Sequence, residues 1–214
     1  MVLFLGKYMN IKNKELIKRI IDISYRHNLS HIGSCITTLP IIKEIYDTKK
    51  PKEKFILSAG HAHLAHLVVM EEKGYITDLE RKLEKFGIHC DIRAGCDCST
   101  GSLGQGLPIA VGMALADRSR NVYCLISDGE CAEGSIQEAL RIAHENNLNN
   151  LKIYLNFNGF AAYRSTKGMY LVEPHKIEVY MTDMKEYPEW LQGQQAHYVT
   201  LDTLKYMELM EILK

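Results

Sequence analysis

The chain has 214 residues, of which 46% are hydrophobic and 24% charged, proportions typical of a soluble domain with one sizeable core. It carries 26 Lys and Arg against 26 Asp and Glu, so no basic excess indicates nucleic acid, and the zero net charge is compatible with self-association. No run of about 18 apolar residues predicts a membrane span, residues 1–6 lack a signal-peptide cleavage pattern, and six scattered cysteines do not resemble a secreted disulfide framework. We therefore expect a cytoplasmic protein.

The first half of the chain alternates helical patterns with one short apolar run. In chain order, we expect an amphipathic helix over 13–27, a helix over 38–46, a strand over 55–57, an apolar helix ending at Glu72 and capped by Gly74, a charged helix over 77–86, an irregular segment over 87–99 and a very apolar helix over 107–116. Thr37 or Thr38 is the expected N-cap of the second helix, with Pro40 in its first turn, where a missing N–H does no harm.

The second half is organised around a strand–helix–strand unit. Residues 122–126 and 151–155 are apolar runs typical of buried strands, and 133–146 has apolar residues at helical spacing. In such a unit, ligands bind beyond the carboxyl ends of the strands. Beyond Phe160 the pattern weakens, and we expect a strand over 177–181, a loop over 186–195 and a helix over 201–213. No repeat or low-complexity linker divides the chain, so we expect one domain over 1–214.

Polar residues follow both strands of this unit. Asp128 ends the first strand with a carboxylate, Asn158 ends the second with an amide oxygen, and Gly129 lets the backbone approach an anion. Free N–H groups at the start of the following helix attract phosphate oxygens, and hard oxygen ligands favour Mg²⁺ or Ca²⁺ over Zn²⁺. Taken singly, Asp-Gly and Asn-Gly are ordinary turns. Together they indicate a site for a metal-bound diphosphate.

A series of short motifs begins at Asp128 and ends at Gly159, namely Asp-Gly-Glu, Glu-Gly, Glu-Ala, Asn-Leu and Asn-x-Asn-Gly. The series resembles the thiamine diphosphate signature of the transketolase family. The resemblance implies a three-layer α/β/α thiamine diphosphate-binding fold with a mostly parallel central sheet. It also implies thiamine diphosphate as cofactor, with Mg²⁺ or Ca²⁺ held by Asp128, Asn158 and the backbone carbonyl of Phe160.

Four further segments resemble motifs of the same family, namely Ser30–Ser34, Leu57–Ala62, Ser99–Leu107 and, with altered spacing, Gly87–His89. The resemblance implies that His31 contacts substrate and cofactor, that His61 meets the diphosphate or the substrate end, and that His89 contacts substrate. Ketol transfer also needs proton donors and acceptors near pH 7, where histidine titrates. A lone histidine is more often a satisfied core or surface residue, and we keep that interpretation for His63 and His66.

The glycine-rich segment within 99–107 would cradle the aminopyrimidine side of the cofactor and contribute to a dimer contact. The cofactor-binding set that the resemblance implies is His61, Gly101, Ser102, Leu103, Gly104, Asp128, Gly129, Glu130 and Asn158. Glu133 stands where the family has an acidic residue that reaches across the dimer to the glutamate activating the aminopyrimidine. The alternative for Glu133 is a helix N-terminal glutamate that interacts with the helix dipole.

A competing interpretation concerns the cysteines before the glycine-rich segment. His89-Cys90 and Cys96-Asp97-Cys98 are rich enough in ligands for a zinc or redox cluster. The segment lacks the Cys-x-x-Cys spacing of structural zinc sites. Plain loop thiols are therefore the interpretation we favour from sequence.

Several positions depart from the family pattern. Ser127 stands where glycine is usual, Asn156 where Asp is frequent, and Leu191 where relatives have a histidine that contacts the diphosphate. His197 is a candidate replacement for that histidine. The part of the chain from about 161 is also shorter than in relatives.

In transketolases, the glutamate that activates the cofactor comes from a second, pyrimidine-binding domain of another subunit. The resemblance therefore implies a split transketolase, in which this chain is the N-terminal subunit of a heterotetramer, inactive without a separate C-terminal subunit. We expect transfer of a two-carbon ketol unit between sugars or phosphosugars, without nucleic acid or membrane partners. The alternatives are an interaction subunit with impaired catalysis and a thiamine-dependent synthase acting on pyruvate and an aldehyde.

Overall fold

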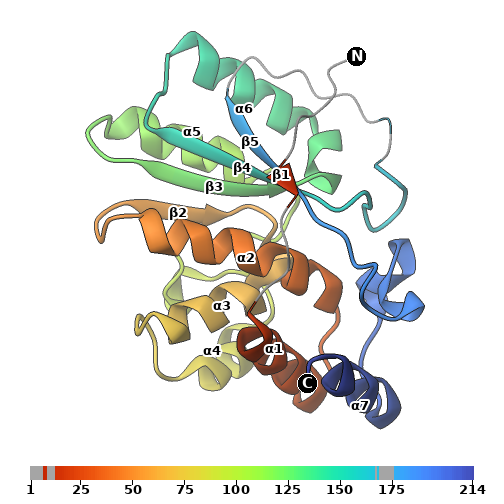
Figure 1. The fold of residues 1–214 in the computed structure, drawn as a ribbon. Coiled ribbons are helices and arrows are strands. Elements are labelled where there is room, and N and C mark those ends of the chain that lie inside the picture. Colours follow the sequence, from red (N-terminus) through yellow and green to blue (C-terminus); the bar gives the residue numbers. More distant parts are fainter. Residues whose placement is uncertain (1–6, 9–12, 167, 169–175) are drawn as a thin grey trace.

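The central feature is a five-stranded parallel sheet (Figure 1). The computed structural model describes residues 7–8, 13–166, 168 and 176–214. Across the sheet, the strands are β1 (Lys7–Tyr8), β5 (Ile177–Met181), β4 (Leu151–Phe157), β3 (Val122–Ser127) and β2 (Lys54–Leu57). Each neighbouring pair is parallel, so all carboxyl ends lie at one edge of the sheet.

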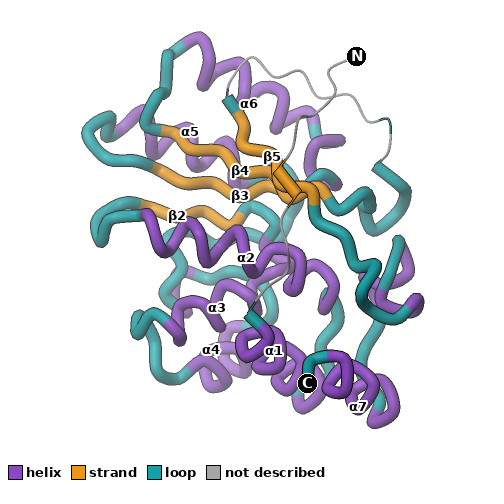
Figure 2. The backbone as a smooth tube through the Cα atoms, viewed as in Figure 1, coloured by secondary structure: helices purple, strands orange, loops and turns teal. Residues whose placement is uncertain are grey.

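Helices cover both faces of the sheet and make three layers (Figure 2). One face carries α5 (Gly106–Ala116) and α6 (Gly134–Glu145). The other face carries α1 (Lys14–Arg26), α2 (Ile32–Thr48), α3 (His63–Glu72), α4 (Leu79–Phe86) and α7 (Thr203–Ile212). The predicted three-layer α/β/α architecture with a parallel sheet is therefore confirmed.

Alternating side chains of β3 explain the two hydrophobic cores. Tyr123 and Leu125 belong to the core shared with α1, α2 and α3, whereas Cys124 and Ile126 belong to the core shared with α5 and α6. All six residues of β3 are buried, as expected for a parallel strand covered on both faces. The apolar run that the sequence analysis assigned to a buried strand, β3, thus contributes to both hydrophobic cores.

The second helix begins earlier than the sequence predicted. We expected it over 38–46, but α2 starts at Ile32 and Pro40 lies inside it. Thr37 and Thr38 do not cap the helix; they are buried, and both hydroxyls donate to the carbonyl of Ser34 at 3.3 and 2.7 Å. Burial of this apolar segment against α3 outweighs the helix-breaking tendency of an internal proline.

The remaining predicted helices and strands are present with ends shifted by a few residues. The strand β1 was not predicted, because two residues carry no periodic signal. Residues 167 and 169–175, in the part of the chain where the sequence pattern weakens, lie outside the described residues. Among the described residues, no helix combines the length and apolar character that crossing a bilayer requires.

The segment 87–99 is irregular, as predicted, apart from a short 3₁₀ turn at Ile92–Ala94. Its cysteines differ in burial. Cys90 and Cys96 are buried in the core beside α3, whereas Cys98 is only half-buried. Cys90 and Cys96 are free thiols of this loop, but their burial was not predicted, because it arises where the loop folds back onto α3.

Candidate active site

The pairing of β3 with β4 brings the two predicted metal-binding residues to one edge of the sheet. Ser127, the last residue of β3, pairs in register with Asn156 of β4. Asp128 and Asn158 therefore leave the sheet beside each other. The Oδ2 atom of Asp128 accepts a hydrogen bond of 2.8 Å from the N–H of Gly159, the residue after Asn158. Both side chains line one cavity of about 200 Å³.

The carboxylate of Asp128 is almost fully buried, with 2% of the residue exposed. It accepts hydrogen bonds from the Gly129 N–H at 3.1 Å and from the Thr166 hydroxyl at 2.6 Å, in addition to the Gly159 N–H. Among the described residues, no cationic side chain forms an ion pair with it. Burial raises the pKa of Asp128 to about 6, since a desolvated carboxylate without a counter-charge is unfavourable. A cation in the cavity would supply that counter-charge.

Asn158 and Phe160 lie in the turn that follows β4. The Oδ1 atom of Asn158 accepts from the backbone N–H of Phe160 at 3.0 Å, and Gly159 between them has a φ of +90°, which favours glycine. Both residues line the same cavity as Asp128. The turn thus places an amide oxygen and a backbone segment opposite the carboxylate.

Three histidines predicted from sequence meet in this cavity. His31 and His61 have ring centroids 5.2 Å apart, and His89 lines the same cavity from the loop before the glycine-rich segment. Burial lowers the pKa of His61 to about 3, with a further contribution from neighbouring His31, and it also lowers the pKa values of His31 and His89. All three imidazoles are therefore neutral at pH 7 and able to both donate and accept a proton.

His31 is held in an unusual backbone conformation at the start of α2. Its φ is 61°, in the left-handed region that non-glycine residues rarely adopt. Its N–H donates to the carbonyl of His197 at 3.1 Å. Within the described part of the chain, its buried Nδ1 atom has no hydrogen-bond partner. Such an orphaned polar atom at a cavity suits a ligand group that completes its hydrogen bonding.

The glycine-rich segment lies against the cavity, and Glu130 supports it from behind. Glu130 is fully buried and does not line the cavity. Its Oε1 atom accepts from the hydroxyl of Ser58 at 2.6 Å and from the N–H of Gly104 at 3.0 Å, while Oε2 accepts from the N–H of Ser127 at 3.0 Å. One carboxylate therefore ties together β2, β3 and the glycine-rich segment.

The other predicted cofactor-binding residues divide into two groups. Gly101, Leu103 and Gly129 line the cavity, but Ser102 and Gly104 do not. Gly104 has a φ of +77°, and a Cβ atom there would lie 2.6 Å from the side chain of Glu133. Glu133, at the start of α6, therefore packs under the glycine-rich segment, outside the cavity.

From the sequence we expected the free N–H groups of a helix to follow Asp128 directly, and the structure differs. A 3₁₀ turn, Gly129–Ala132, separates Asp128 from α6. The Gly129 N–H already donates to Asp128. A Cβ atom at Gly129 would lie 3.2 Å from that of Ala161, so a side chain there would crowd the contact between these two turns.

Several residues of the site were not predicted from sequence. Ser34 and Thr38 line the cavity from α2, Ala161 and Ala162 line it from the turn after β4, and Thr166 reaches Asp128. Ser34 ends the Ser30–Ser34 motif but had no role assigned from sequence, and the other residues belong to no motif. Asn156, noted as a departure, donates to the Thr37 hydroxyl at 3.1 Å and accepts from the Thr182 hydroxyl at 2.6 Å, which fixes the end of β4 between α2 and β5.

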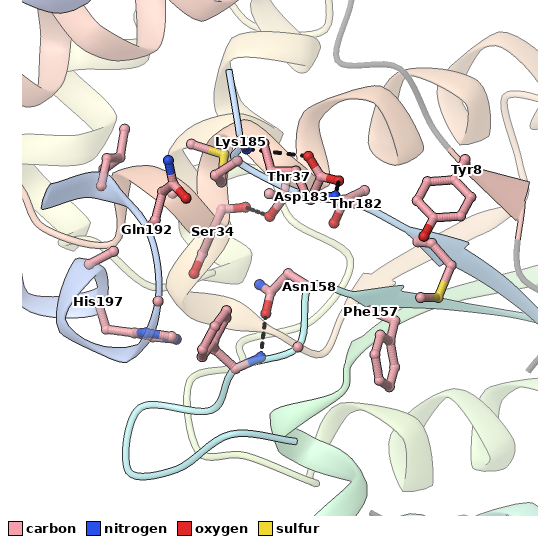
Figure 3. A pocket seen from close by; sticks show the side chains of 18 residues that line it. Tyr8, Ser34, Thr37, Phe157, Asn158, Thr182, Asp183, Lys185, Gln192 and His197 are labelled. Atoms are coloured by element: carbon pink, nitrogen blue, oxygen red, sulfur yellow. Dashed lines mark hydrogen bonds and ion pairs between the residues drawn. The ribbon is translucent and has the colours of Figure 1, made fainter. Parts of the chain in front are cut away.

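A second cavity of about 430 Å³ adjoins the first and shares Ser34, Asn158, Phe160 and His197 with it. Figure 3 shows Asn158 and His197 pointing toward its middle from different elements. Leu191 is buried and lines only this larger cavity. The ring of His197 lies 6.1 Å from that of His31, so His197, and not residue 191, brings an imidazole to the predicted diphosphate region.

The residues present fit a metal diphosphate. A buried carboxylate without a cationic partner, an adjacent amide oxygen and a backbone turn form a set of hard oxygen donors, which suits Mg²⁺ or Ca²⁺. The neutral imidazoles and the orphaned Nδ1 atom of His31 provide hydrogen-bonding groups for phosphate or sugar oxygens.

Comparisons with known proteins point to one family. A family model described as transketolase, thiamine diphosphate binding domain, matches residues 43–173. One subunit of the apulose-4-phosphate transketolase of Phocaeicola vulgatus is 32% identical over 170 residues, covering 70% of this chain and 60% of that protein. The 6-deoxy-6-sulfo-D-fructose transketolase subunit SqwG of Clostridium sp. (strain MSTE9) is 32% identical over 167 residues, covering 68% and 61%. The chain thus spans about three fifths of the length of these relatives.

A solved structure supports the fold. Transketolase from Campylobacter jejuni superimposes with a TM-score of 0.73 at 18% identity, over 96% of this chain and 43% of that one. Because the family model covers more than half of the sequence, this chain belongs to the transketolase family, and it contains the family's thiamine diphosphate binding domain.

Proposed function

We propose that this chain is the cofactor-binding subunit of a two-subunit transketolase, which transfers a two-carbon ketol unit between sugars or phosphosugars. The observation that carries the proposal is the shared edge of β3 and β4, where Asp128 and Asn158 face one cavity beside a buried histidine cluster. Two relatives with similar identity are named as subunits of transketolases, which supports a separate partner chain here.

Asp128, Asn158 and the backbone carbonyl of Phe160 would hold Mg²⁺, and the metal would bind the diphosphate of the cofactor. Thiamine diphosphate, when bound, supplies a nucleophilic carbon that can carry a two-carbon unit. The protein holds the cofactor through the edge of β3 and β4 and through Gly101 and Leu103. Glu130 acts as a positioning residue, because it fixes the glycine-rich segment without reaching the cavity.

The histidines would handle the protons of the sugar. His31, His61 and His89 are neutral at pH 7 because burial lowers their pKa values. A neutral imidazole can accept a proton from a hydroxyl and return one to a carbonyl oxygen. We assign His197 to the diphosphate, in the place that a histidine at position 191 has in relatives, since His197 lines both cavities.

The partner chain would bring the glutamate that activates the aminopyrimidine, and Glu133 would lie at the contact with it. Glu133 is half-buried at the start of α6, beside the glycine-rich segment. In this assignment the assembly contains two copies of each chain, as expected for twofold symmetry. The sugar substrates are assigned only by class.

The test is reconstitution of the enzyme. The chain is co-expressed with a candidate partner that carries a pyrimidine-binding domain and is encoded beside it. The complex is assayed for ketol transfer with thiamine diphosphate and Mg²⁺. The variant is Asp128→Asn, and the matched control is Asp117→Asn, in the turn between α5 and β3. We expect transfer by the wild type and the control only.

Three results would each contradict part of the proposal. A complex that binds the cofactor but turns over only pyruvate with an aldehyde would indicate a synthase. A complex that forms without binding the cofactor would indicate an interaction subunit, which the departures at Ser127 and Leu191 would then explain. Full activity of the Asp128→Asn complex would remove the assigned metal site.

A further inference from the structure

Four potential metal ligands from two separate segments meet in the core beside α3. His63 and His66 lie one helical turn apart on α3, and Cys90 and Cys96 lie on the loop that precedes the glycine-rich segment. Their exposed fractions are 0%, 1%, 4% and 7%, respectively. Four polar or ionisable side chains buried together at this depth require mutual hydrogen bonds or a bound ion.

Three of these side chains already lie at distances that suit a shared metal ion, and His66 approaches one of the three. The Nε2 atom of His63 lies 3.4 Å from the Sγ atom of Cys96, and the Nδ1 atom of His66 lies 3.7 Å from the same sulfur. The ligand atoms of His63, Cys90 and Cys96 all lie within 4.8 Å of one another. In a tetrahedral zinc site, zinc–sulfur bonds are about 2.3 Å and zinc–nitrogen bonds about 2.0 Å long, which places nitrogen about 3.5 Å from sulfur.

The surroundings also suit a metal. The second nitrogen of His66, Nε2, hydrogen-bonds to the hydroxyl of Tyr46 at 2.7 Å, the type of outer contact that fixes a ligating histidine. Without an ion, the helix would instead bury two imidazoles against two thiols.

We propose that His63, His66, Cys90 and Cys96 bind a structural zinc ion. Two thiolates and two imidazoles favour zinc. They do not favour Mg²⁺ or Ca²⁺, the hard cations that suit the oxygen ligands of the Asp128 site. All four coordination positions would be filled by protein, so the site would be closed to substrate and water. The spacing, His-x₂-His and Cys-x₅-Cys, differs from the common knuckle pattern, which is why the sequence did not predict it.

The position of the cluster gives the ion a structural consequence for the active site. His61 precedes His63 by two residues, and His89 directly precedes Cys90. The N–H of Thr100 donates to the carbonyl of Cys90 at 3.1 Å, so the loop continues directly into the glycine-rich segment. A zinc ion would therefore fix two cavity histidines and the start of that segment to α3.

The first experiment measures metal in the full-length chain. The protein is purified without chelators, and its zinc content is measured by inductively coupled plasma mass spectrometry. Replacing zinc with Co²⁺ should give thiolate-to-cobalt charge transfer and the visible bands of tetrahedral cobalt. We expect stoichiometric zinc, the tetrahedral cobalt spectrum, and a lower Tm after chelation, because a metal bound only by the folded state stabilises it. None of these three readouts depends on catalysis or on thiamine diphosphate.

Two matched variants locate the site. Cys96→Ser should lose stoichiometric zinc, whereas Cys98→Ser should keep it, because Cys98 lies in the same loop and its sulfur donates to the Ser99 carbonyl outside the cluster. The cobalt spectrum of the wild type remains decisive if Cys96→Ser unfolds. A protein purified with no zinc and giving no tetrahedral cobalt spectrum, or with a Cys90–Cys96 disulfide in place of metal, would overturn the proposal. Equal zinc in Cys96→Ser would do the same.

Discussion

Two carboxylates separated by one residue serve different purposes in this structure. Asp128 faces the cavity, where burial raises its pKa to about 6. Glu130 faces the protein and accepts hydrogen bonds from Ser58, Gly104 and Ser127. The carboxylate of Asp128 is suited to bind a cation, whereas both oxygens of Glu130 already accept hydrogen bonds within the protein.

Glu130→Gln should therefore destabilise the folded protein. A glutamine has one acceptor oxygen, and its NH₂ group would face buried donors that the glutamate now satisfies. We expect a loss of about 1–3 kcal/mol in the free energy of unfolding, as is typical when a buried hydrogen-bonding group is left unsatisfied. Urea denaturation followed by circular dichroism measures it. Glu138→Gln, on the exposed side of α6, should change stability little, and equal losses in both variants would contradict this role.

At the scale of elements, close backbone contact sets the position of the glycine-rich segment. A Cβ atom at Gly60 would lie 2.8 Å from the backbone of Thr100 and 2.9 Å from the N–H nitrogen of Gly101. A Cβ atom at Gly112 on α5, by contrast, would have no neighbour within 4 Å. A glycine-to-alanine substitution can thus be compared at a position where the methyl group would meet backbone atoms and at one where it would meet none.

Gly60→Ala should destabilise the protein by about 1–3 kcal/mol, because backbone atoms must shift to accept the methyl group. Gly112→Ala should stabilise it by about 0.5–1 kcal/mol, because alanine favours the helix. Thermal unfolding of both variants measures the difference. Should Gly60→Ala match the wild type in Tm, the close approach of the segment to Gly60 would be incorrect.

Ion pairs join α1 to α4. Glu80 pairs with Arg26 and Arg19 and hydrogen-bonds to His27 at 3.2 Å. The hydrogen bond from Arg26, followed by that from His27, lowers the pKa of Glu80 from 4.5 to about 2. The folded state thus holds Glu80 ionised at pH values where the unfolded chain takes up a proton.

The sign of the pH effect follows from this shift. Glu80 contributes its full stabilisation above about pH 4.5, and the contribution is lost as pH falls from there through about 2. Because the pairs lie near the surface, solvent screening limits the contribution to about 1 kcal/mol. Glu80→Gln should therefore lose stability at neutral pH and show a weaker loss on acidification, measured by urea denaturation across this range. Glu84→Gln, exposed on the same helix, should retain the wild-type pH profile.

The sequence predicted the elements with strong periodicity and missed those set by tertiary contacts. The apolar runs of β3 and β4 and the stripe of α6 were read correctly, since parallel strands and an amphipathic helix have distinct patterns. The start of α2 was missed because Pro40 and two threonines are typical of a helix N-terminus, while the decisive contacts with α3 come from distant sequence.

At the scale of the whole molecule, the candidate site was predictable only in part. The residues at the ends of β3 and β4 were accessible to sequence reasoning, because adjacent parallel strands end at one edge. Thr166 was not, no role was assigned to Ser34, and the place of His197 could not be fixed, because the approach of these residues depends on how α2 and the C-terminal segment fold over that edge. The His63–Cys96 cluster was missed for the same reason, since its two segments are separated by α4.

The most direct test of the metal diphosphate site is calorimetric titration of the full chain with thiamine diphosphate, in the presence of Mg²⁺ or of a chelator. The account predicts binding that requires the metal, is lost in Asp128→Asn and is kept in Asp117→Asn. Titrations in which the wild type shows no metal-dependent heat, or in which Asp128→Asn binds as the wild type does, would contradict it.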